Sequence, residues 1–469
     1  MLKVYNTLSR KKEAFAPRKG KQVNLFVCGP TVYDFSHIGH SRTYLVFDMV
    51  AKYLRQQGFK VFYLQNITDI DDKIIKRAKE EKISWKKLSQ KFQREYLKDM
   101  KALKIDSVTK YAPATKYIKE IIGQVKRLLK KGFAYQTDDG VYYDIKKFKG
   151  YGKLSGRTVK GAEDSVSRID ESKDKRNKGD FCLWKISKPE EPAWPSPWGK
   201  GRPGWHIEDT AITEKFFGPQ YDIHGGARDL IFPHHEAEIS QMEAISGKTP
   251  LVKYWLHTGF LTVKGEKMAK SLGNFITIKD FLEKYSGRLL RLFVLKTHYR
   301  SPINYDEKEI SEVKKQLEKI DNFIDKLKSK KAKKKVKIES KNLLTDMVAK
   351  FQKDFDEAVA DDFNTPKAAA ALFKLINEGN TLLSQNKISA AAAGHILEFL
   401  KRTDEFFGFI FWTKTKEKIS TNVLNLVKER EKQRLAKNWQ RADELRDKIE
   451  NLGYLIEDTI EGPKIIKKS

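Results

Sequence analysis

Short apolar runs alternate with a helical pattern over the N-terminal part of the chain. The run Leu-Phe-Val at 25–27, followed by Cys-Gly-Pro, is typical of a buried strand that ends at a turn. A helical spacing of large apolar residues begins near His40, and residues 60–69 form a second strand. Strand, helix and strand predict a right-handed βαβ unit. We therefore expect an α/β fold with a Rossmann-type parallel sheet, whose strand ends carry the chemistry.

The middle of the chain changes character twice. Residues 71–132 are helical in pattern and heavily charged, whereas 133–200 begin with a hairpin signal around Asp139-Gly140 and continue with a polar, charged stretch. We interpret 133–200 as an insertion. Residues 201–253 are dense in Trp, His, Gly and Pro, which predicts active-site loops and then a helix that opens at Pro233.

Residues 254–306 predict a strand, a Lys- and Gly-rich loop and a helix. Beyond residue 307 the pattern is almost wholly helical, and a Lys-rich connector at 326–340 interrupts these helices. Asn-Thr-Pro at 364–366 predicts a helix start in an all-α helical bundle. These patterns divide the chain into six predicted segments, at 1–132, 133–200, 201–253, 254–306, 307–411 and 412–469, of which the second is the connective insertion and the fifth the helical bundle.

Charge and cysteine usage narrow the class of protein. Lys and Arg number 92 against 62 Asp and Glu, a net charge of +30, which favours a polyanionic partner such as nucleic acid; a highly charged soluble surface is the alternative. Only Cys28 and Cys182 are present, which excludes a disulfide framework. Because eighteen apolar residues never run together, we expect a cytoplasmic protein.

The tetrapeptide His-Ile-Gly-His follows the first strand at the start of a helix, a position that favours phosphate. His37 and His40 can donate hydrogen bonds to an α-phosphate, and Gly39 lets adenine lie against the backbone. A pair of surface histidines is the alternative. Lys267 and Lys270 offer two ammonium groups on a Gly-flanked loop, which can close on a pyrophosphate leaving group or be plain solvated surface.

A metal site is a third candidate. His234 and Glu238 lie four residues apart, so both project from one face of a helix. Cys28 adds a thiolate from the end of the first strand, and thiolate, imidazole and carboxylate together suit zinc. An ordinary surface pair is the alternative reading of His234 and Glu238.

These motifs resemble those of the class I aminoacyl-tRNA synthetases, whose signatures are His-Ile-Gly-His and Lys-Met-Ser-Lys-Ser. The second signature departs here at Ala269. Within that class the chain resembles the cysteinyl-tRNA synthetases from about Tyr5 to its end, through the segments CGPTVYDFSHIGH, LWKISKPEEPAWPSPWGKGRPGWHIE, DIHGGARDLIFPHHEAE and NWQRADELRDKIENLGYLIEDT.

The resemblance implies ATP-dependent formation of cysteinyl adenylate and transfer of the aminoacyl group to tRNA(Cys), with Mg²⁺ accompanying ATP, by a monomer. It also implies that 1–132 and 201–253 are the two halves of the catalytic domain, 254–306 a stem-contact region and 412–469 an anticodon-binding module. It implies zinc on Cys28, Asp209, His234 and Glu238, with Asp209 where the family commonly has a second cysteine, and with Glu208 and His206 close enough in sequence to substitute. A zinc-bound thiolate would distinguish cysteine from serine or alanine. The resemblance implies that His37, His40, Lys267 and Lys270 are the catalytic residues. The implied ATP-binding residues are His37, Gly39, His40, Asp229, Lys267, Lys270 and Ser271. The implied amino-acid-binding residues are Cys28, Gly29, Thr68, Trp205, His206 and His224.

A basic helical face with one aromatic residue occurs near the C-terminus. Such a face suits phosphate contact and stacking on an unpaired anticodon base, although the aromatic side chain could equally be core. Its residues, which we expect to bind tRNA, are Arg434, Lys437, Trp439, Arg441 and Arg446.

Two other functions are compatible with parts of this pattern. A cysteine ligase acting on a small amine, as in the mycothiol pathway, would share the zinc and both loops, but the basic region 307–469 argues against it. A tRNA-binding protein with a decayed active site is suggested by Ala269 and Asp209. The intact histidines and lysines of both loops argue against decay.

Overall fold

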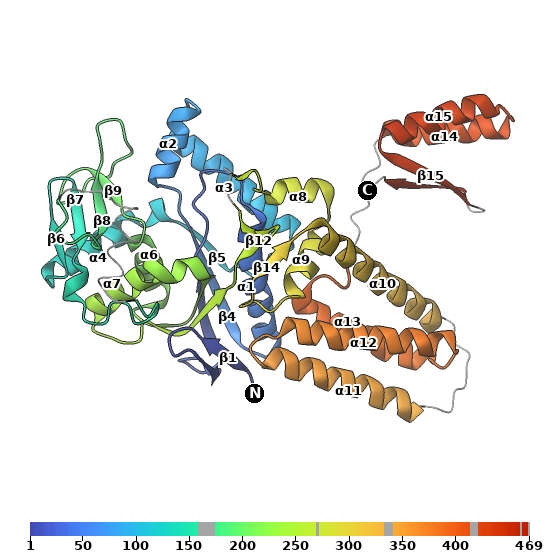
Figure 1. Cartoon of the computed structure of the whole chain (residues 1–469), viewed down its shortest axis with the longest axis horizontal. Helices are drawn as coiled ribbons and strands as arrows, with labels where there is room; N and C mark the ends of the chain where they lie inside the picture. Colours follow the sequence, from blue (N-terminus) through green and yellow to red (C-terminus); the bar gives the residue numbers. More distant parts are fainter. Residues whose placement is uncertain (158–173, 269–271, 333–340, 413–420, 460–461, 468–469) are drawn as a thin grey trace. The chain divides into compact units, whose positions relative to one another are not determined.

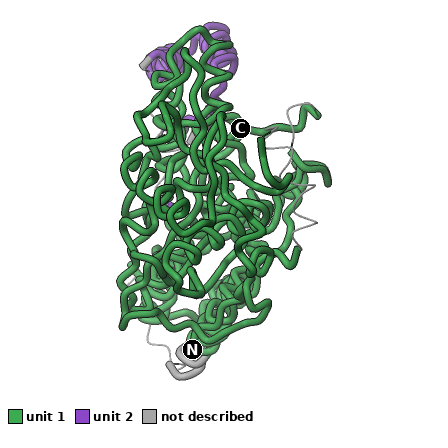
Figure 2. Tube along the Cα trace, turned by 90° about the vertical axis from the view of Figure 1, so that its left-hand side faces the viewer, with its two compact units in different colours: residues 1–411 green, residues 412–469 purple. Residues whose placement is uncertain are grey.

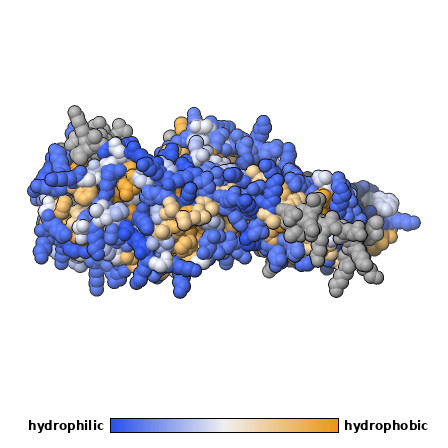
Figure 3. Space-filling view, turned by 90° about the horizontal axis from the view of Figure 1, so that it is seen from below, coloured by the Kyte–Doolittle hydropathy of each residue, from blue (hydrophilic) through white to orange (hydrophobic). Residues whose placement is uncertain are grey.

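The computed structural model describes residues 1–157, 174–268, 272–332, 341–412, 421–459 and 462–467. The chain divides into two compact units, residues 1–411 and 412–469, which Figure 2 draws in green and purple. Within the described residues, no helix combines the length and apolar character needed to cross a membrane. Hydrophilic side chains cover most of the face drawn in Figure 3.

A five-stranded parallel sheet forms the centre of the first unit, in the order β11-β10-β3-β4-β5. Its strands are β3 (Gln22–Val27), β4 (Lys60–Ile67), β5 (Lys110–Pro113), β10 (Tyr221–Ala227) and β11 (Val252–Thr258). The parallel Rossmann-like core is as expected. The interpretation of 71–132 as wholly helical was wrong, because β5 lies within it as an edge strand, too short to leave an apolar pattern of its own.

Helices cover both faces of this sheet (Figure 1). Leu25 and Val27 pack in a core with α1 (Ile38–Gln56), whereas Phe26, between them, packs on the other face with α4 (Ile118–Lys130), α6 (Ile207–Phe217) and α7 (Glu236–Ser246). This follows from the alternation of side chains along a strand. The remaining helices beside β4 and β5 are α2 (Asp72–Glu80) and α3 (Trp85–Ala102).

The insertion contains a separate antiparallel sheet. Its strands, in the order β6-β7-β8-β9, are β6 (Ala134–Gln136), β7 (Gly140–Tyr143), β8 (Phe181–Ile186) and β9 (Gly201–Pro203). β6 and β7 form the hairpin that was expected around Asp139-Gly140. Residues 158–173 of the polar stretch lie outside the described residues.

The helix that carries Glu238 starts where the sequence predicted. Residues 231–235 form a π-helical turn with a kink at Phe232, which is extended with φ −139° and ψ 132°. Helical conformation resumes at Pro233 and continues into α7, whose α-helical residues begin at Glu236. The expected start at Pro233 is therefore confirmed, and the extended Phe232 has the conformation that a residue before proline favours.

The rest of the first unit joins a small sheet to a helical bundle. The small sheet contains β12 (Leu261–Val263), β13 (Glu266–Lys267) and β14 (Ile303–Tyr305), and an N-terminal hairpin contains β1 (Lys3–Asn6) and β2 (Lys11–Ala14). The helices are α8 (Ile278–Lys284), α9 (Gly287–Leu295), α10 (Glu307–Ala332), α11 (Lys341–Ala360), α12 (Thr365–Ser384) and α13 (Ala390–Phe407).

Two expectations about this bundle have different outcomes. Asn364 caps α12 by accepting from the backbone N–H of Lys367, and proline occupies the first turn, so the expected helix start is confirmed. The connector expected at 326–340 was wrong in its first half, because α10 continues to Ala332 and buries Leu327 in the core. Residues 333–340 lie outside the described residues.

The second unit is a helix pair followed by a hairpin, as the sequence predicted. It comprises α14 (Thr421–Leu435), α15 (Trp439–Asn451), β15 (Tyr454–Thr459) and β16 (Gly462–Lys467). Its small core contains Val423, Val427, Ile449 and Ile456.

Candidate functional site

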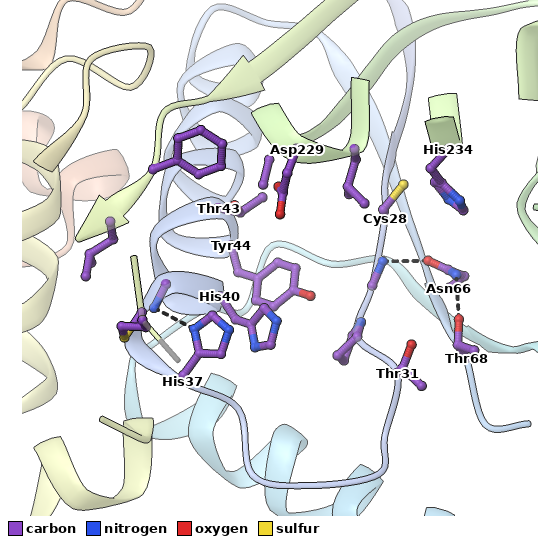
Figure 4. Close-up of a pocket in the computed structure, with 18 of the residues that line it drawn as sticks. Cys28, Thr31, His37, His40, Thr43, Tyr44, Asn66, Thr68, Asp229 and His234 are labelled. Carbon is purple, nitrogen blue, oxygen red and sulfur yellow. Dashed lines mark hydrogen bonds between the residues drawn. The ribbon is translucent and has the colours of Figure 1, made fainter. Parts of the chain in front are cut away.

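A pocket opens at the carboxyl ends of β3 and β4, the edge at which parallel α/β sheets bind ligands. Figure 4 shows His37 and His40 at one end of it and Cys28 and His234 at the other. Cys28, from the end of the first strand, and the histidines of the His-Ile-Gly-His motif therefore line one pocket. Of the predicted site residues, the lining includes Cys28, Gly29, His37, Gly39, His40, Thr68, Trp205, Asp209, Asp229, His234 and Lys267.

Gly29 fixes the approach of the first strand end to the second. A Cβ atom at Gly29 would lie 1.8 Å from the backbone oxygen of Asn66, so no larger residue fits. The N–H of Gly29 donates to Asn66 Oδ1 at 2.5 Å. This contact places Cys28 beside the end of β4.

His37 is both the N-cap of α1 and a wall of the pocket. Its Nδ1 accepts from the backbone N–H of Gly39 at 3.1 Å, and its ring stacks on that of His40 with centroids 3.8 Å apart. Because Nδ1 is an acceptor, the ring proton sits on Nε2. Burial, helped by the charge of Lys267, lowers the pKa of His37 to about 4. Burial also lowers the pKa of His40. Both rings are thus neutral hydrogen-bonding groups at neutral pH.

The Lys-rich loop is described only in part. Lys267 ends β13 and lines the pocket, and the methyl group of Met268 approaches Gly39, where an added Cβ would lie 2.9 Å from it. The start of the loop therefore lies over the start of α1. Ala269, Lys270 and Ser271 lie outside the described residues.

A buried cluster of metal-ligand types lies at the other end of the pocket. Cys28 Sγ is 3.4 Å from Asp209 Oδ2 and 3.9 Å from Glu238 Oε1. His234 Nε2 is 2.9 Å from the same Asp209 oxygen and 3.2 Å from the same Glu238 oxygen. One atom from each residue lies within 4.8 Å of the others. The four residues are those that the resemblance implied as ligands.

A second set shares two members with the first. Cys28 Sγ lies 3.4 Å from His224 Nε2 and 3.2 Å from His235 Nε2, and these three residues form a further group with Glu238. His235 was not singled out from the sequence. Its position directly after His234 was the available signal, but adjacent side chains ordinarily point apart. The turn at 231–235 directs both rings toward Cys28.

The electrostatics of the cluster favour a cation. Burial raises the pKa of the Cys28 thiol, and the carboxylates of Asp209 and Glu238 raise it further. Burial and Asp209 likewise raise the pKa of Glu238. The oxygens that face Cys28 Sγ and His234 Nε2 are Asp209 Oδ2 and Glu238 Oε1. A divalent cation among these donor atoms would offset the buried negative charge, and the donor types fit zinc.

Some of the predicted amino-acid-binding residues line the pocket, and others lie behind its lining. Trp205 lines the pocket with its ring 4.5 Å from that of His234. His206 lies behind His234, with the two Nδ1 atoms 2.8 Å apart, and is not in the lining. His224 is also behind the lining, where it stacks on Trp255 with ring centroids 4.3 Å apart.

Thr68 is held by a carboxylate behind the pocket. Its hydroxyl donates to Glu208 Oε1, which also accepts from Asn66 Nδ2 at 3.2 Å. Burial and Asp209 raise the pKa of Glu208. Glu208 was considered from the sequence only as a substitute ligand, because nothing local indicated that it faces the end of β4.

Asp229 lines the pocket from a short helical turn after β10. Gly225 and Gly226, which precede Asp229 along the chain, both lie inside β10. A Cβ atom at Gly225 would come within 2.3 Å of the Phe47 ring, and one at Gly226 within 2.7 Å of the His235 ring. The glycines let α1 and the turn at 231–235 approach the strand.

The predicted tRNA-binding residues near the C-terminus differ in their exposure and in the bonds that their side chains make within the second unit. Trp439 opens α15 and is 59% exposed, so it is not a core residue. Arg434 lies 2.5 Å from Asp458, and Arg441 pairs with Glu444. Arg446 donates to the backbone of the hairpin. Lys437 is exposed at the turn between the helices, with φ +59°.

Comparisons of the sequence with known proteins agree over its whole length. Residues 14–315 match the family described as tRNA synthetases class I (C) catalytic domain, and residues 354–411 match the DALR domain. The cysteine–tRNA ligase of Methanococcus maripaludis is 47% identical over 478 residues, covering 100% of this chain and 99% of that protein. The cysteine–tRNA ligase of Carboxydothermus hydrogenoformans is 44% identical, with 98% and 99% covered, and that of Thermococcus onnurineus 45%, with 98% of each covered.

Solved structures share the fold at low identity. Methionyl-tRNA synthetase of Mycobacterium tuberculosis in complex with methionyl-adenylate has a TM-score of 0.63 at 15% identity, covering 83% of this chain and 90% of that one. A putative arginyl tRNA synthetase from Campylobacter jejuni has a TM-score of 0.57 at 16% identity, covering 84% and 93%.

Proposed function

The chain belongs to the cysteine–tRNA ligase family of class I tRNA synthetases, and from that premise we propose that it ligates L-cysteine to tRNA(Cys) in the pocket between His37 and Cys28. The observation that carries this proposal is that one pocket joins two kinds of group. Paired neutral imidazoles at a helix N-terminus suit a phosphate, and a buried thiol, imidazole and carboxylate cluster suits a metal-bound thiolate.

In the first step a carboxylate oxygen of cysteine attacks the α-phosphorus of ATP. The bond from that phosphorus to the bridging oxygen breaks, and pyrophosphate leaves with the electron pair. In the second step a hydroxyl of the terminal tRNA ribose attacks the carbonyl carbon, its proton is lost, and AMP leaves. Both steps develop charge on phosphate or carbonyl oxygens, so fixed donors contribute by stabilising that charge.

The roles of the phosphate-binding residues follow from their placement. The Nε2–H of His37 is free to donate to the α-phosphate because Nδ1 accepts from Gly39. His40 stacks behind it and stabilises its orientation. Lys267 brings positive charge to the same end of the pocket, and we assign Lys270 and Ser271 to the leaving pyrophosphate from the motif alone. Asp229 is assigned to the ribose hydroxyls, and Mg²⁺ is expected with ATP.

The buried cluster is proposed to hold zinc through Cys28, Asp209, His234 and Glu238. The ion would supply a Lewis acid that holds the substrate sulfur as thiolate, which an alcohol or methyl group cannot reproduce. The chain's own residues orient the amino acid: Trp205 forms a wall, and His206 fixes the ring of His234 from behind. Gly29, Thr68 and His224 complete the proposed amino-acid site.

The second unit is proposed to bind the anticodon of tRNA(Cys). Exposed Trp439 offers a stacking surface beside cationic side chains, with Arg434, Lys437, Arg441 and Arg446 as the proposed phosphate contacts. We expect a cytoplasmic monomer.

The test is ATP–pyrophosphate exchange with zinc-loaded protein, followed by charging of tRNA(Cys). Exchange should depend on cysteine and be far weaker with serine and alanine. Absence of cysteine-dependent exchange would overturn the proposed activity. Equal rates with serine would instead overturn the thiolate-binding role of the cluster.

A further inference from the structure

Glu208 is buried one layer behind the pocket and touches two residues that line it. It lies in the first turn of α6 with a relative exposure of 1%. Its Oε1 atom accepts from Asn66 Nδ2 at 3.2 Å and from the hydroxyl of Thr68. Neither the metal cluster nor the phosphate site uses this carboxylate.

The backbone N–H of Gly29 determines which way the hydrogen bonds of Asn66 and Glu208 run. The N–H of Gly29 can only donate, so Asn66 Oδ1 accepts from it. The amide nitrogen of Asn66 must then face the other way, where Glu208 Oε1 accepts from it. Glu208 therefore presents an acceptor to Thr68.

Thr68 has only its hydroxyl left for a ligand. Its backbone N–H donates to Pro30 O at 3.1 Å, and its carbonyl accepts from the N–H of Val32 at 3.1 Å. Its hydroxyl proton points at Glu208, and its oxygen accepts from Asn66 Nδ2 at 3.5 Å. The second lone pair of this oxygen can still accept a hydrogen bond from a ligand, but the hydroxyl has no other proton to donate.

We propose that Glu208 is a positioning residue that makes Thr68 an obligate acceptor for the α-ammonium group of the amino-acid substrate. The inference rests on the proposed function, since it assumes that an amino acid occupies the pocket. With the sulfur directed to the cluster of Cys28 and the ammonium group to Thr68, the substrate carboxylate is the end left to face the phosphate site. Glu208 thereby sets which end of the substrate faces the phosphate site.

The experiment compares ligands with and without the amino group. L-cysteine and 3-mercaptopropionate share the thiol and the carboxylate, and their dissociation constants are measured by calorimetry with the full zinc-loaded chain. Wild type should bind L-cysteine more tightly. Glu208→Leu, which removes the acceptor, should weaken L-cysteine by about tenfold to a hundredfold, the range of a hydrogen bond to a charged group, and should leave 3-mercaptopropionate within about twofold.

Matched variants keep the inference testable even if Glu208→Leu folds poorly. Thr68→Val should lose the tighter binding of L-cysteine relative to 3-mercaptopropionate. Thr68→Ser should retain it because the hydroxyl remains. Glu214→Gln, on the same helix but bonded to Arg127 and Gln124, should leave both affinities unchanged.

The possible failures are distinguishable. Equal weakening of both ligands by Glu208→Leu and Thr68→Val would assign a purely structural role and overturn the inference, as would no weakening of either. Wild-type protein that binds neither ligand and supports no exchange would overturn the proposed function itself.

Discussion

The sulfur of Cys28 lies 3.4 Å from Oδ2 of Asp209, although Cys28 ends a strand and Asp209 lies in the first turn of a helix on another part of the chain. Both residues are buried, and His234 contacts the same carboxylate oxygen at 2.9 Å. The position at which the family commonly has a second cysteine is therefore within coordination reach of the first. Asp209 occupies the same place with an oxygen donor.

Asp209→Cys should raise zinc affinity, because a thiolate is a softer ligand than a carboxylate for this ion. We expect an increase of about tenfold or more in competition with a chromophoric chelator. Asp209→Asn keeps the shape without the charge and should lower the affinity. Identical zinc affinities in all three proteins would exclude Asp209 from the coordination sphere.

His37 should make the protein less stable in acid. Its folded-state pKa of about 4 lies below the usual value of 6.5, so the unfolded chain binds more protons between these values and the free energy of unfolding rises with pH. This contribution is complete above about pH 6.5 and is lost as pH falls to about 4, at roughly 1.4 kcal/mol per unit of pKa shift.

Chemical denaturation between pH 4 and 7 measures this effect. His37→Asn keeps an acceptor for the N–H of Gly39 but removes the titrating ring, so its unfolding free energy should fall less on acidification than that of wild type. Parallel pH profiles for the two proteins would mean that His37 is not buried as a neutral ring.

Gly29→Ala should disrupt the junction of β3 and β4, because the new methyl group would lie 1.8 Å from a backbone oxygen. Overpacking of this kind costs on the order of 1–3 kcal/mol or more, and cysteine-dependent exchange should be lost with it. Gly123→Ala is the matched control: it lies in α4 with nothing within 4 Å of the added Cβ. It should stabilise the chain by up to about 1 kcal/mol, and thermal denaturation distinguishes the two.

Trp439→Ala should weaken the binding of tRNA(Cys) by about 1–3 kcal/mol if its exposed ring stacks on one base. Cysteine-dependent pyrophosphate exchange should be unaffected, because that pocket is built within residues 1–411. Leu435→Ala removes a side chain that is 86% exposed and cannot stack, so it serves as the control. Equal tRNA affinities of both variants would contradict the stacking role.

The sequence by itself determined the features that depend on neighbours along the chain. The apolar run before Cys28, the helix start near His40, the hairpin at Asp139-Gly140 and the cap at Asn364 all follow from local propensity and spacing, and each is present in the structure, where α1 begins at Ile38. The two motifs proposed to bind phosphate and three of the four proposed ligands were recognisable for the same reason.

The tertiary structure decided the features that depend on residues far apart in sequence. The short strand β5 exists because β4 offers a partner edge, and His235 faces Cys28 because Phe232 is extended before a proline. Glu208 meets Thr68 only when α6 packs behind the end of β4. A local sequence pattern predicts the conformation of a segment. The packing of distant segments decides which buried side chains share a hydrogen bond.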